Sequence, residues 1–118
     1  MNEIWPTEIK VREAGSSLAI AFDNGETGEI TAELLRVESP SAEVKGHGPG
    51  QEQLVWGKRK VRITRAEAVG NYAIRLIFDD GHSTGIFTWA YLRKLMNESA
   101  VMFATYEKKL AAANLSRG

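Results

Sequence analysis

One pattern occurs twice in this sequence, in residues 20–36 and again in residues 76–93. Each copy contains Phe-Asp-Asx-Gly, followed by an isoleucine, a threonine and a Leu-Arg pair, with one additional residue in the second copy. Asn-Gly and Asp-Gly accept the positive φ angles of a two-residue type I′ turn, and the flanking residues favour strands. Each copy therefore predicts a β-hairpin, with its turn at Asn24-Gly25 or at Asp80-Gly81.

A helix is predicted directly after each hairpin. Thr31 and Thr88 stand where a side-chain oxygen can accept a hydrogen bond from an unpaired amide of the first helical turn. The predicted helices cover residues 32–38 and 89–97, and each carries apolar residues at the spacing of one buried stripe. The stripe residues are Leu34 and Leu35 in the first helix, and Trp89, Leu92, Leu95 and Met96 in the second.

A C-terminal helix is predicted over about residues 99–113, with Ser99 as its cap. Its apolar residues fall on one face. They are Met102, Tyr106, Leu110 and Ala113. This face either closes the core of the chain, which we favour, or offers a surface through which a homodimer forms.

Two further strands are predicted from the alternation of apolar and polar residues. Ile9 and Val11 alternate within residues 8–13, and Val61 and Ile63 alternate within residues 58–69. The whole pattern predicts an α+β fold with a mainly antiparallel sheet, built from two hairpin-helix units and a C-terminal helix. A length of 118 residues and a hydrophobic content of 43% are sufficient for one domain, residues 1–118.

The composition excludes several functional classes. Fifteen basic and fifteen acidic residues cancel, so no net charge draws the chain to nucleic acid or to an anionic membrane. The absence of cysteine excludes disulfides, thiolate zinc sites and iron–sulfur clusters held by this chain alone. Because no stretch approaches the ~20 apolar residues of a membrane span and no leader pattern is present, we expect a soluble, cytoplasmic protein.

The stretch ESPSAEVKGHGPG, residues 38–50, has the composition of a binding loop. It does not fit a nucleotide loop, because Gln51 stands where the dinucleotide fingerprint requires glycine, and Gly57-Lys58 is followed by Arg59 rather than Ser or Thr. We therefore expect an exposed loop. Since no nucleophile or acid–base pair occurs in a recognisable context, we expect no catalytic residue and no cofactor, and hence no enzyme.

The chain has two histidines, His47 and His82. Across a two-residue turn, Asp79 faces His82, so a contact between these side chains is the favoured explanation of His82. The favoured explanation of His47 is a solvated loop residue. An alternative is a metal or small-ligand site with nitrogen and oxygen ligands, formed by His82, His47, Glu43 and Asp79.

Residues 58–65 carry five positive charges and are the best sequence evidence for binding nucleic acid. The zero net charge and the lack of an aromatic stacking face disfavour this alternative, and basic residues on an edge strand also protect sheets from pairing. Among the tryptophans, we expect Trp89 to be buried. We expect Trp56 to be partly exposed, where it could anchor a protein partner.

Several motifs occur in a characteristic order along residues 6–95. They are Ser39–Gly50, Gly57-Lys58, Val69–Ala73, Phe78–Phe87 and Trp89–Leu92. This series resembles the gamma-butyrobetaine hydroxylase-like N-terminal domain family. The resemblance implies that, in carnitine-synthesis oxygenases, this domain precedes the catalytic domain. It also implies that the domain holds zinc there through three cysteines and one histidine.

The implied cysteines fall on Ser39, Ser41 and Val44, and the implied histidine falls on His82. Hydroxyls are poor zinc ligands and valine has no donor atom, so we expect no metal here. We expect Ser39 and Ser41 to hold their loop by hydrogen bonds to local backbone, and His82 to act as a polar support.

The resemblance also implies a function. The H-x-D motif of the oxygenase catalytic domain does not occur in this sequence, and other relatives are fused to P-loop ATPases of iron–sulfur cluster assembly. We therefore expect a non-catalytic accessory domain that binds an unidentified protein partner. The partner would belong to an iron–sulfur assembly system or to a 2-oxoglutarate oxygenase system.

Overall fold

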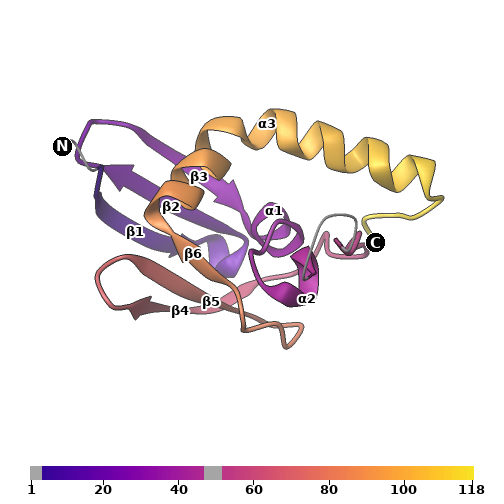
Figure 1. The fold of residues 1–118 in the computed structure, drawn as a ribbon, viewed down its shortest axis with the longest axis horizontal. Helices are drawn as coiled ribbons and strands as arrows, with labels where there is room; N and C mark the ends of the chain where they lie inside the picture. The colour runs from indigo at the N-terminus through magenta and orange to yellow at the C-terminus, as the bar shows by residue number, and fades with distance from the viewer. Residues whose placement is uncertain (1–3, 47–51) are drawn as a thin grey trace.

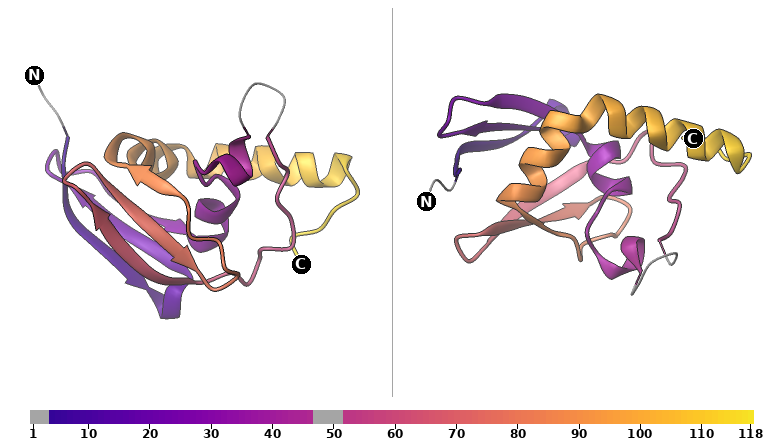
Figure 2. Two further views of the ribbon diagram at one scale, coloured as in Figure 1. Left: turned by 60° about the horizontal axis from the view of Figure 1, so that its bottom comes forward. Right: turned by 45° about the horizontal axis from the view of Figure 1, so that its top comes forward.

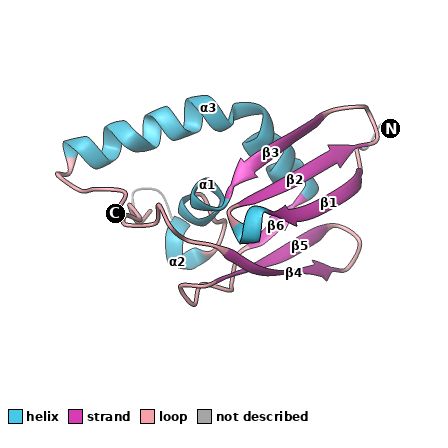
Figure 3. Cartoon of the chain, turned by 180° about the vertical axis from the view of Figure 1, so that it is seen from behind, coloured by secondary structure: helices cyan, strands magenta, loops and turns pink. Residues whose placement is uncertain are grey.

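The computed structural model describes residues 4–46 and 52–118 and contains two three-stranded antiparallel sheets, each followed by a helix (Figure 1). The first unit consists of β1 (Pro6–Arg12), the short turn η1 (Glu13–Gly15), β2 (Ser17–Phe22), β3 (Thr27–Thr31) and α1 (Ala32–Val37). The second consists of β4 (Ile63–Val69), β5 (Ala73–Phe78), β6 (Ile86–Thr88) and α3 (Trp89–Ala112), and α2 (Ala42–Lys45) lies in the connection. The predicted α+β fold is confirmed, with its strands divided between two sheets (Figure 3).

The two units end their hairpins in the same way. Thr31 of β3 pairs with Ser17 of β2, and Thr88 of β6 pairs with Ala73 of β5. Thr31 Oγ1 accepts a hydrogen bond from the Leu34 amide at 3.1 Å, and Thr88 Oγ1 accepts one from the Tyr91 amide at 3.2 Å. Both predicted helix caps are confirmed.

The hairpin turns differ from the predicted type I′ turns. In the second hairpin the Phe78 amide donates to the His82 carbonyl at 2.9 Å, and the Gly81 amide donates to the Phe78 carbonyl at 3.2 Å. Gly81 has a φ of 93°, whereas Asp80 does not have a positive φ. The turn is therefore a three-residue loop that needs a left-handed conformation only at its glycine. The predicted pairing of Asp79 with His82 is wrong, because Phe78 is the residue opposite His82.

The first hairpin has the same three-residue loop. The Phe22 amide donates to the Glu26 carbonyl at 2.8 Å, and the Gly25 amide donates to the Phe22 carbonyl at 3.1 Å. Gly25 has a φ of 91°, and Asn24 does not have a positive φ. An Asx-Gly pair satisfies both turn types, so the sequence pattern could locate the hairpins without fixing their loop length.

The C-terminal part of the chain forms one helix, α3, where the sequence predicted helices at 89–97 and 99–113. Ser99 lies inside α3, and its hydroxyl donates to the Met96 carbonyl at 3.4 Å instead of capping a new helix. Such bonding to the preceding turn bends helices, and α3 changes direction in its N-terminal half (Figure 1). Tyr106 and Leu110 are buried in this chain's own core, as the favoured alternative required. No helix among residues 4–46 and 52–118 is long and apolar enough to cross a membrane.

The basic segment is only partly a strand. β4 begins at Ile63 rather than at Lys58, and residues 59 and 60 form a turn. The Val61 amide donates to the Lys58 carbonyl at 3.1 Å, which closes this turn. The early strand β1 covers Pro6–Arg12. It ends at Arg12 because Glu13 adopts a φ of 52° and turns the chain away from the sheet.

One hydrophobic core joins the two units. It includes Leu18 and Ile30 of the first sheet, Leu76 and Phe87 of the second, and Leu95 of α3. Helix α3 contacts β3 and β6, so a single helix lies against both sheets (Figure 2). After α3 the chain returns along residues 57–59, where the Gly57 amide donates to the Ser116 carbonyl at 2.9 Å and the Arg59 amide donates to the Arg117 carbonyl at 2.8 Å.

Candidate functional site

The first candidate site, which we name the buried polar cluster, has a buried centre of Ser39, Ser41 and His82, with the exposed residues Glu43 and Thr84 at its edge. Ser39 and Ser41 lie between α1 and α2, whereas His82 and Thr84 lie between β5 and β6. The Ser39 hydroxyl is 2.8 Å from His82 Nε2, and the Ser41 hydroxyl is 2.6 Å from the Thr84 hydroxyl. The fold therefore brings together three of the four positions of the implied zinc site, with Glu43 from α2 and Thr84 from the second unit.

Glu43 lies on the other side of the histidine ring, with its Oε2 atom 3.0 Å from His82 Nδ1. Burial and the nearby positive charge of Arg36 lower the pKa of His82, and the carboxylates of Glu43 and Asp80 oppose this only in part. The ring is therefore neutral at pH 7. Because a carboxylate only accepts, Nδ1–H donates to Glu43 and Nε2 accepts from Ser39.

This serine–histidine–carboxylate order is that of a hydrolase triad, but its surroundings are not. Ser39 has 0% of its surface exposed. A Cβ atom on Gly85 would clash with Ser39 Oγ, so Gly85 lies directly against this hydroxyl. The cluster is suited to joining the two units rather than to acyl transfer.

The expected local hydrogen bonds of the two serines are confirmed. Ser39 Oγ accepts from the Ser41 amide at 3.4 Å, and Ser41 Oγ accepts from the Glu43 amide at 3.2 Å. Ser41 is the N-cap of α2, so part of the predicted exposed loop is a short helix with a buried face. The links to His82 and Thr84 were not predicted. One feature of the sequence could have pointed to Thr84. The second repeat has one additional residue, and residues 82–85 of that repeat are not part of a strand.

The donor set at this place does not fit zinc. It offers two hydroxyls that already take part in hydrogen bonds, one isopropyl group, and one imidazole with both nitrogens occupied. A closed structural zinc site needs four nitrogen or sulfur donors or carboxylates. Within residues 4–46 and 52–118, no group of three or more His, Cys, Asp and Glu side chains is arranged to hold a metal ion.

The alternative ligand set is only partly brought together. Glu43 contacts His82, but the Asp79 carboxylate instead accepts a hydrogen bond from the Arg62 amide at 3.0 Å. His47 lies outside the described residues. Asp79 is therefore excluded from the alternative metal or small-ligand site, and the structure brings together only His82 and Glu43 among its described residues.

A charged group adjoins the cluster at the hairpin turn. Asp80 Oδ2 is 2.7 Å from Lys58 Nζ and 2.7 Å from Arg36 Nε, and Asp80 Oδ1 accepts from the His82 amide at 3.0 Å. Burial alone raises the pKa of Asp80, but the hydrogen bonds from Lys58, the His82 backbone and Arg36 outweigh it and lower the pKa to about 2. Within the described part of the chain, Arg36 Nη1 is buried without a hydrogen-bond partner.

Asp80→Asn is expected to lower the free energy of unfolding by about 1 kcal/mol at pH 7, after allowance for solvent screening of this turn. Asn24 occupies the corresponding position of the first hairpin and makes the same bond, accepting from the Glu26 amide at 3.0 Å, so Asn can keep the bond from the His82 amide. The substitution removes the charge and the two bonds that Oδ2 accepts from Lys58 and Arg36. Because the folded-state pKa lies below the ordinary value, the stability is present above pH 4 and is lost as the pH falls to about 2. Urea unfolding of both proteins between pH 7 and pH 2 measures this.

Glu8→Gln is the matched control, since Glu8 pairs with Lys10 at 3.3 Å on an exposed surface. We expect no measurable change from it at any pH. A loss for Asp80→Asn that stayed constant down to pH 2 would contradict the assigned role of the charge.

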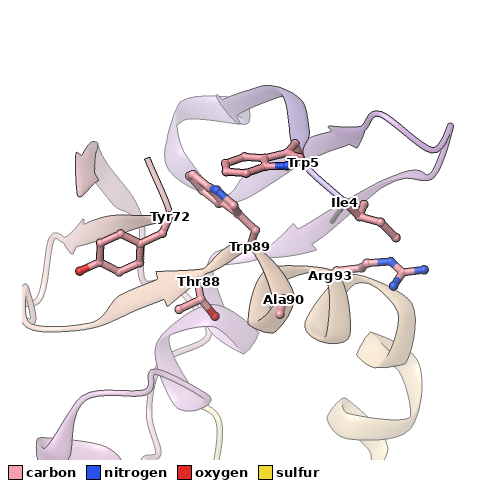
Figure 4. Close-up of a pocket in the computed structure, with 7 residues that line it drawn as sticks. All are labelled: Ile4, Trp5, Tyr72, Thr88, Trp89, Ala90 and Arg93. Atoms are coloured by element: carbon pink, nitrogen blue, oxygen red, sulfur yellow. The ribbon is translucent and has the colours of Figure 1, made fainter. Parts of the chain in front are cut away.

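The second candidate site is an aromatic groove of about 400 Å³ at the opposite end of the sheets from the buried polar cluster. Figure 4 shows the rings of Trp5, Tyr72 and Trp89 around this hollow. It is also lined by Ile4, Thr88, Ala90 and Arg93. The Trp89 indole donates to the Asn71 carbonyl at 2.9 Å, which fixes the ring at the groove wall.

The tryptophans only partly follow expectation. Trp89 is half-buried rather than buried, because one side of its ring faces the groove. Trp56 is 57% exposed, as expected, but it does not line the groove. Asp23 holds the backbone of Trp5 in place. The Trp5 amide donates to Asp23 Oδ1 at 3.2 Å, and the Trp5 carbonyl accepts from the Asp23 amide at 2.8 Å.

Two of the five positive charges of residues 58–65 are paired with carboxylates. Lys58 pairs with Asp80, and Arg65 pairs with Glu67 at 2.7 Å. Arg62 donates to the Glu13 carbonyl at 3.2 Å. β4 is an edge strand of its sheet, but of these residues only Arg65 lies in it, so the protective role agrees with position for Arg65 alone.

The sequence matches the family described as "Gamma-butyrobetaine hydroxylase-like, N-terminal" over residues 9–93. The chain belongs to this family. The predicted membership is therefore confirmed, and the matched region contains both hairpins, the buried polar cluster and the start of α3. No curated protein matches the chain.

Solved structures of similar proteins support the family fold over nearly the whole chain. Two solution structures determined by NMR are 40% and 42% identical, with TM-scores of 0.84 and 0.83. Each covers 98% of this chain, which in turn covers 91% and 86% of those chains. A crystal structure of a protein of unknown function from Acidithiobacillus ferrooxidans, assigned to the DUF971 family, is 41% identical with a TM-score of 0.64. That match covers 76% of this chain and 90% of the other.

Proposed function

We propose that this gamma-butyrobetaine hydroxylase-like N-terminal domain is a non-catalytic, cytoplasmic protein-interaction domain. The aromatic groove of Trp5, Tyr72 and Trp89 carries the proposal. The buried polar cluster supports the non-catalytic part of the proposal, because its nucleophile-like serine is inaccessible and its hydrogen bonds connect the two units.

The groove has the properties of a contact surface for a protein. Aromatic residues dominate the binding energy of protein interfaces because they bury a large, rigid area. Tyr72 is 52% exposed and Trp5 is 38% exposed, so both would lose considerable contact with water on binding. Their positions are fixed by the Asp23 contacts and by the β4–β5 turn, which lowers the entropy lost on association.

The lining also indicates the occupant. Among the described residues, Arg93 is the one charged residue that lines the groove, and its Nε and Nη2 atoms are held by Glu26 at 2.7 Å each. A groove so lined suits a segment of a partner protein that inserts one large apolar side chain beside a neutral or acidic residue. The first candidates are proteins of iron–sulfur assembly and 2-oxoglutarate oxygenases, the systems that the family resemblance implies.

Tyr72→Ala is expected to weaken binding of an identified partner about 30-fold, the effect of losing a hot spot worth about 2 kcal/mol. The partner would be isolated by co-purification, and its dissociation constant would then be measured by calorimetry with the purified domain. Trp56→Ala is the matched control, since it removes an equally exposed aromatic ring outside the groove. Thermal unfolding of both variants checks that neither loses the fold.

Capture of a protein from a lysate does not by itself support the proposal. The support is loss of that protein with Tyr72→Ala and Trp5→Ala, together with retention by Trp56→Ala. Equal binding by all four proteins would overturn the assignment of the groove.

The sequence alternatives have less support. Nucleic acid binding through residues 58–65 lacks a continuous row of free cations, because Lys58 and Arg65 are paired with carboxylates. A metal or small-ligand site at His82 would first have to break the hydrogen bond that Nδ1 donates to Glu43 or the one that Nε2 accepts from Ser39.

A further inference from the structure

A second pocket, which we name the basic pocket, lies where η1, the start of α1 and the turn before β4 meet. Its volume is about 310 Å³. Residues from both units and from the C-terminal segment line it. They are Glu13, Ser16, Ser17, Thr31, Glu33, Arg59, Lys60, Val61, Arg62 and Arg117.

The charges in the basic pocket do not cancel. Arg117 and Glu33 neutralise each other through two bonds, with Arg117 Nη2 2.7 Å from Glu33 Oε1 and Arg117 Nε 2.9 Å from Glu33 Oε2. The remaining charged lining residues are Arg59, Lys60 and Arg62, opposed by Glu13. Three positive charges and one negative charge leave a net charge of +2. Among the described residues, neither Arg59 nor Lys60 forms an ion pair.

The walls of the basic pocket are fixed by contacts that join distant segments. The Arg59 amide donates to the Arg117 carbonyl, and Arg62 donates to the Glu13 carbonyl at 3.2 Å. The Glu13 backbone is held in a left-handed conformation, with a φ of 52°. Left-handed non-glycine residues cost free energy and persist where the surrounding structure enforces them. The cations are therefore presented on a rigid frame.

We propose that the basic pocket binds a small phosphate monoester in its dianionic form. Arginine forks and a lysine ammonium match phosphate oxygens in geometry and charge, and a net charge of +2 complements a dianion. The volume lies at the lower end of the range of small-molecule sites, about 300–1,000 Å³. A small ligand fits better than a nucleic acid strand, because the cations at either end of the basic run, Lys58 and Arg65, are paired elsewhere.

Titration of the isotope-labelled full chain with inorganic phosphate and with AMP, at low ionic strength, tests the proposal by NMR. We expect the amide signals of Arg59, Lys60 and Arg62 to shift with both anions and to stay in place with adenosine. The exposed double substitution Arg59→Gln/Lys60→Gln should weaken AMP binding about tenfold, as expected when two charge-assisted hydrogen bonds are lost at a solvated site.

The matched control is Lys94→Gln/Lys108→Gln, which removes two exposed positive charges from α3 outside the basic pocket. Its AMP affinity should equal that of the unmodified chain. Three results would overturn the proposal. They are unmoved signals at millimolar phosphate and AMP, an equal loss of affinity in the control, and binding of an oligonucleotide without binding of either small anion.

Discussion

Replacing Gly15 by alanine is expected to lower the free energy of unfolding by about 4 kcal/mol. Gly15 has a φ of 96°, and a Cβ atom there would lie 2.5 Å from the Ile63 carbonyl oxygen and 3.1 Å from the Ile63 amide nitrogen. Both neighbours are backbone atoms of β4, so the second sheet would have to move away from η1. For a chain of this size we expect a fall in the melting temperature of about 20 °C, measured by calorimetry or circular dichroism.

Gly25→Ala separates the two causes of this loss. Gly25 has a similar φ of 91°, but a Cβ atom there meets nothing within 4 Å. We expect a loss of about 1 kcal/mol, the cost of the left-handed conformation alone. Equal losses for Gly15→Ala and Gly25→Ala would show that the contact between η1 and β4 does not hold the sheets together.

Gly85→Ala is expected to cost about 3 kcal/mol, because its new methyl group would displace the Ser39 hydroxyl from His82. The added Cβ would clash with Ser39 Oγ and lie 3.1 Å from a ring carbon of Phe87. Ser39 and Phe87 are fully buried, so neither can turn into solvent. Urea unfolding at pH 7 measures the loss.

A double-mutant cycle makes this prediction specific. Ser39→Ala alone should cost about 1.5 kcal/mol, because it leaves His82 Nε2 without a donor. The pair Ser39→Ala/Gly85→Ala should cost about 2 kcal/mol rather than the sum of about 4.5 kcal/mol, since the clash disappears with the hydroxyl. Additive losses would indicate that Gly85 and Ser39 do not pack against each other.

Local sequence signals located the hairpins and the first turns of α1 and α3 correctly. Asx-Gly pairs and cap threonines act within a few residues, so their effect on the backbone does not depend on the rest of the fold. Ser99 was misread for the same reason. A serine in this context also fits a helix interior when its hydroxyl bonds to the preceding turn, as the Ser99 hydroxyl does to the Met96 carbonyl.

The candidate sites were harder to predict. The family resemblance marked Ser39, Ser41, Val44 and His82, but Glu43 entered only as a metal ligand and Thr84 was not expected. The residues of the aromatic groove are distant in sequence, because Trp5 precedes β1, Tyr72 follows β4 and Trp89 begins α3. No periodicity links such positions, so sequence spacing could not show that they share one surface.

The amino-acid sequence by itself determined the class of fold, the family, and the absence of cysteine from the implied zinc positions, because these follow from residue types and their local order. Only the tertiary structure decided which residues meet: Ser39 with His82, Gly15 with Ile63, and Arg117 with Glu33. Each of these contacts joins segments far apart along the chain. Their geometry results from packing two sheets and one long helix around a shared core, and no local propensity encodes it.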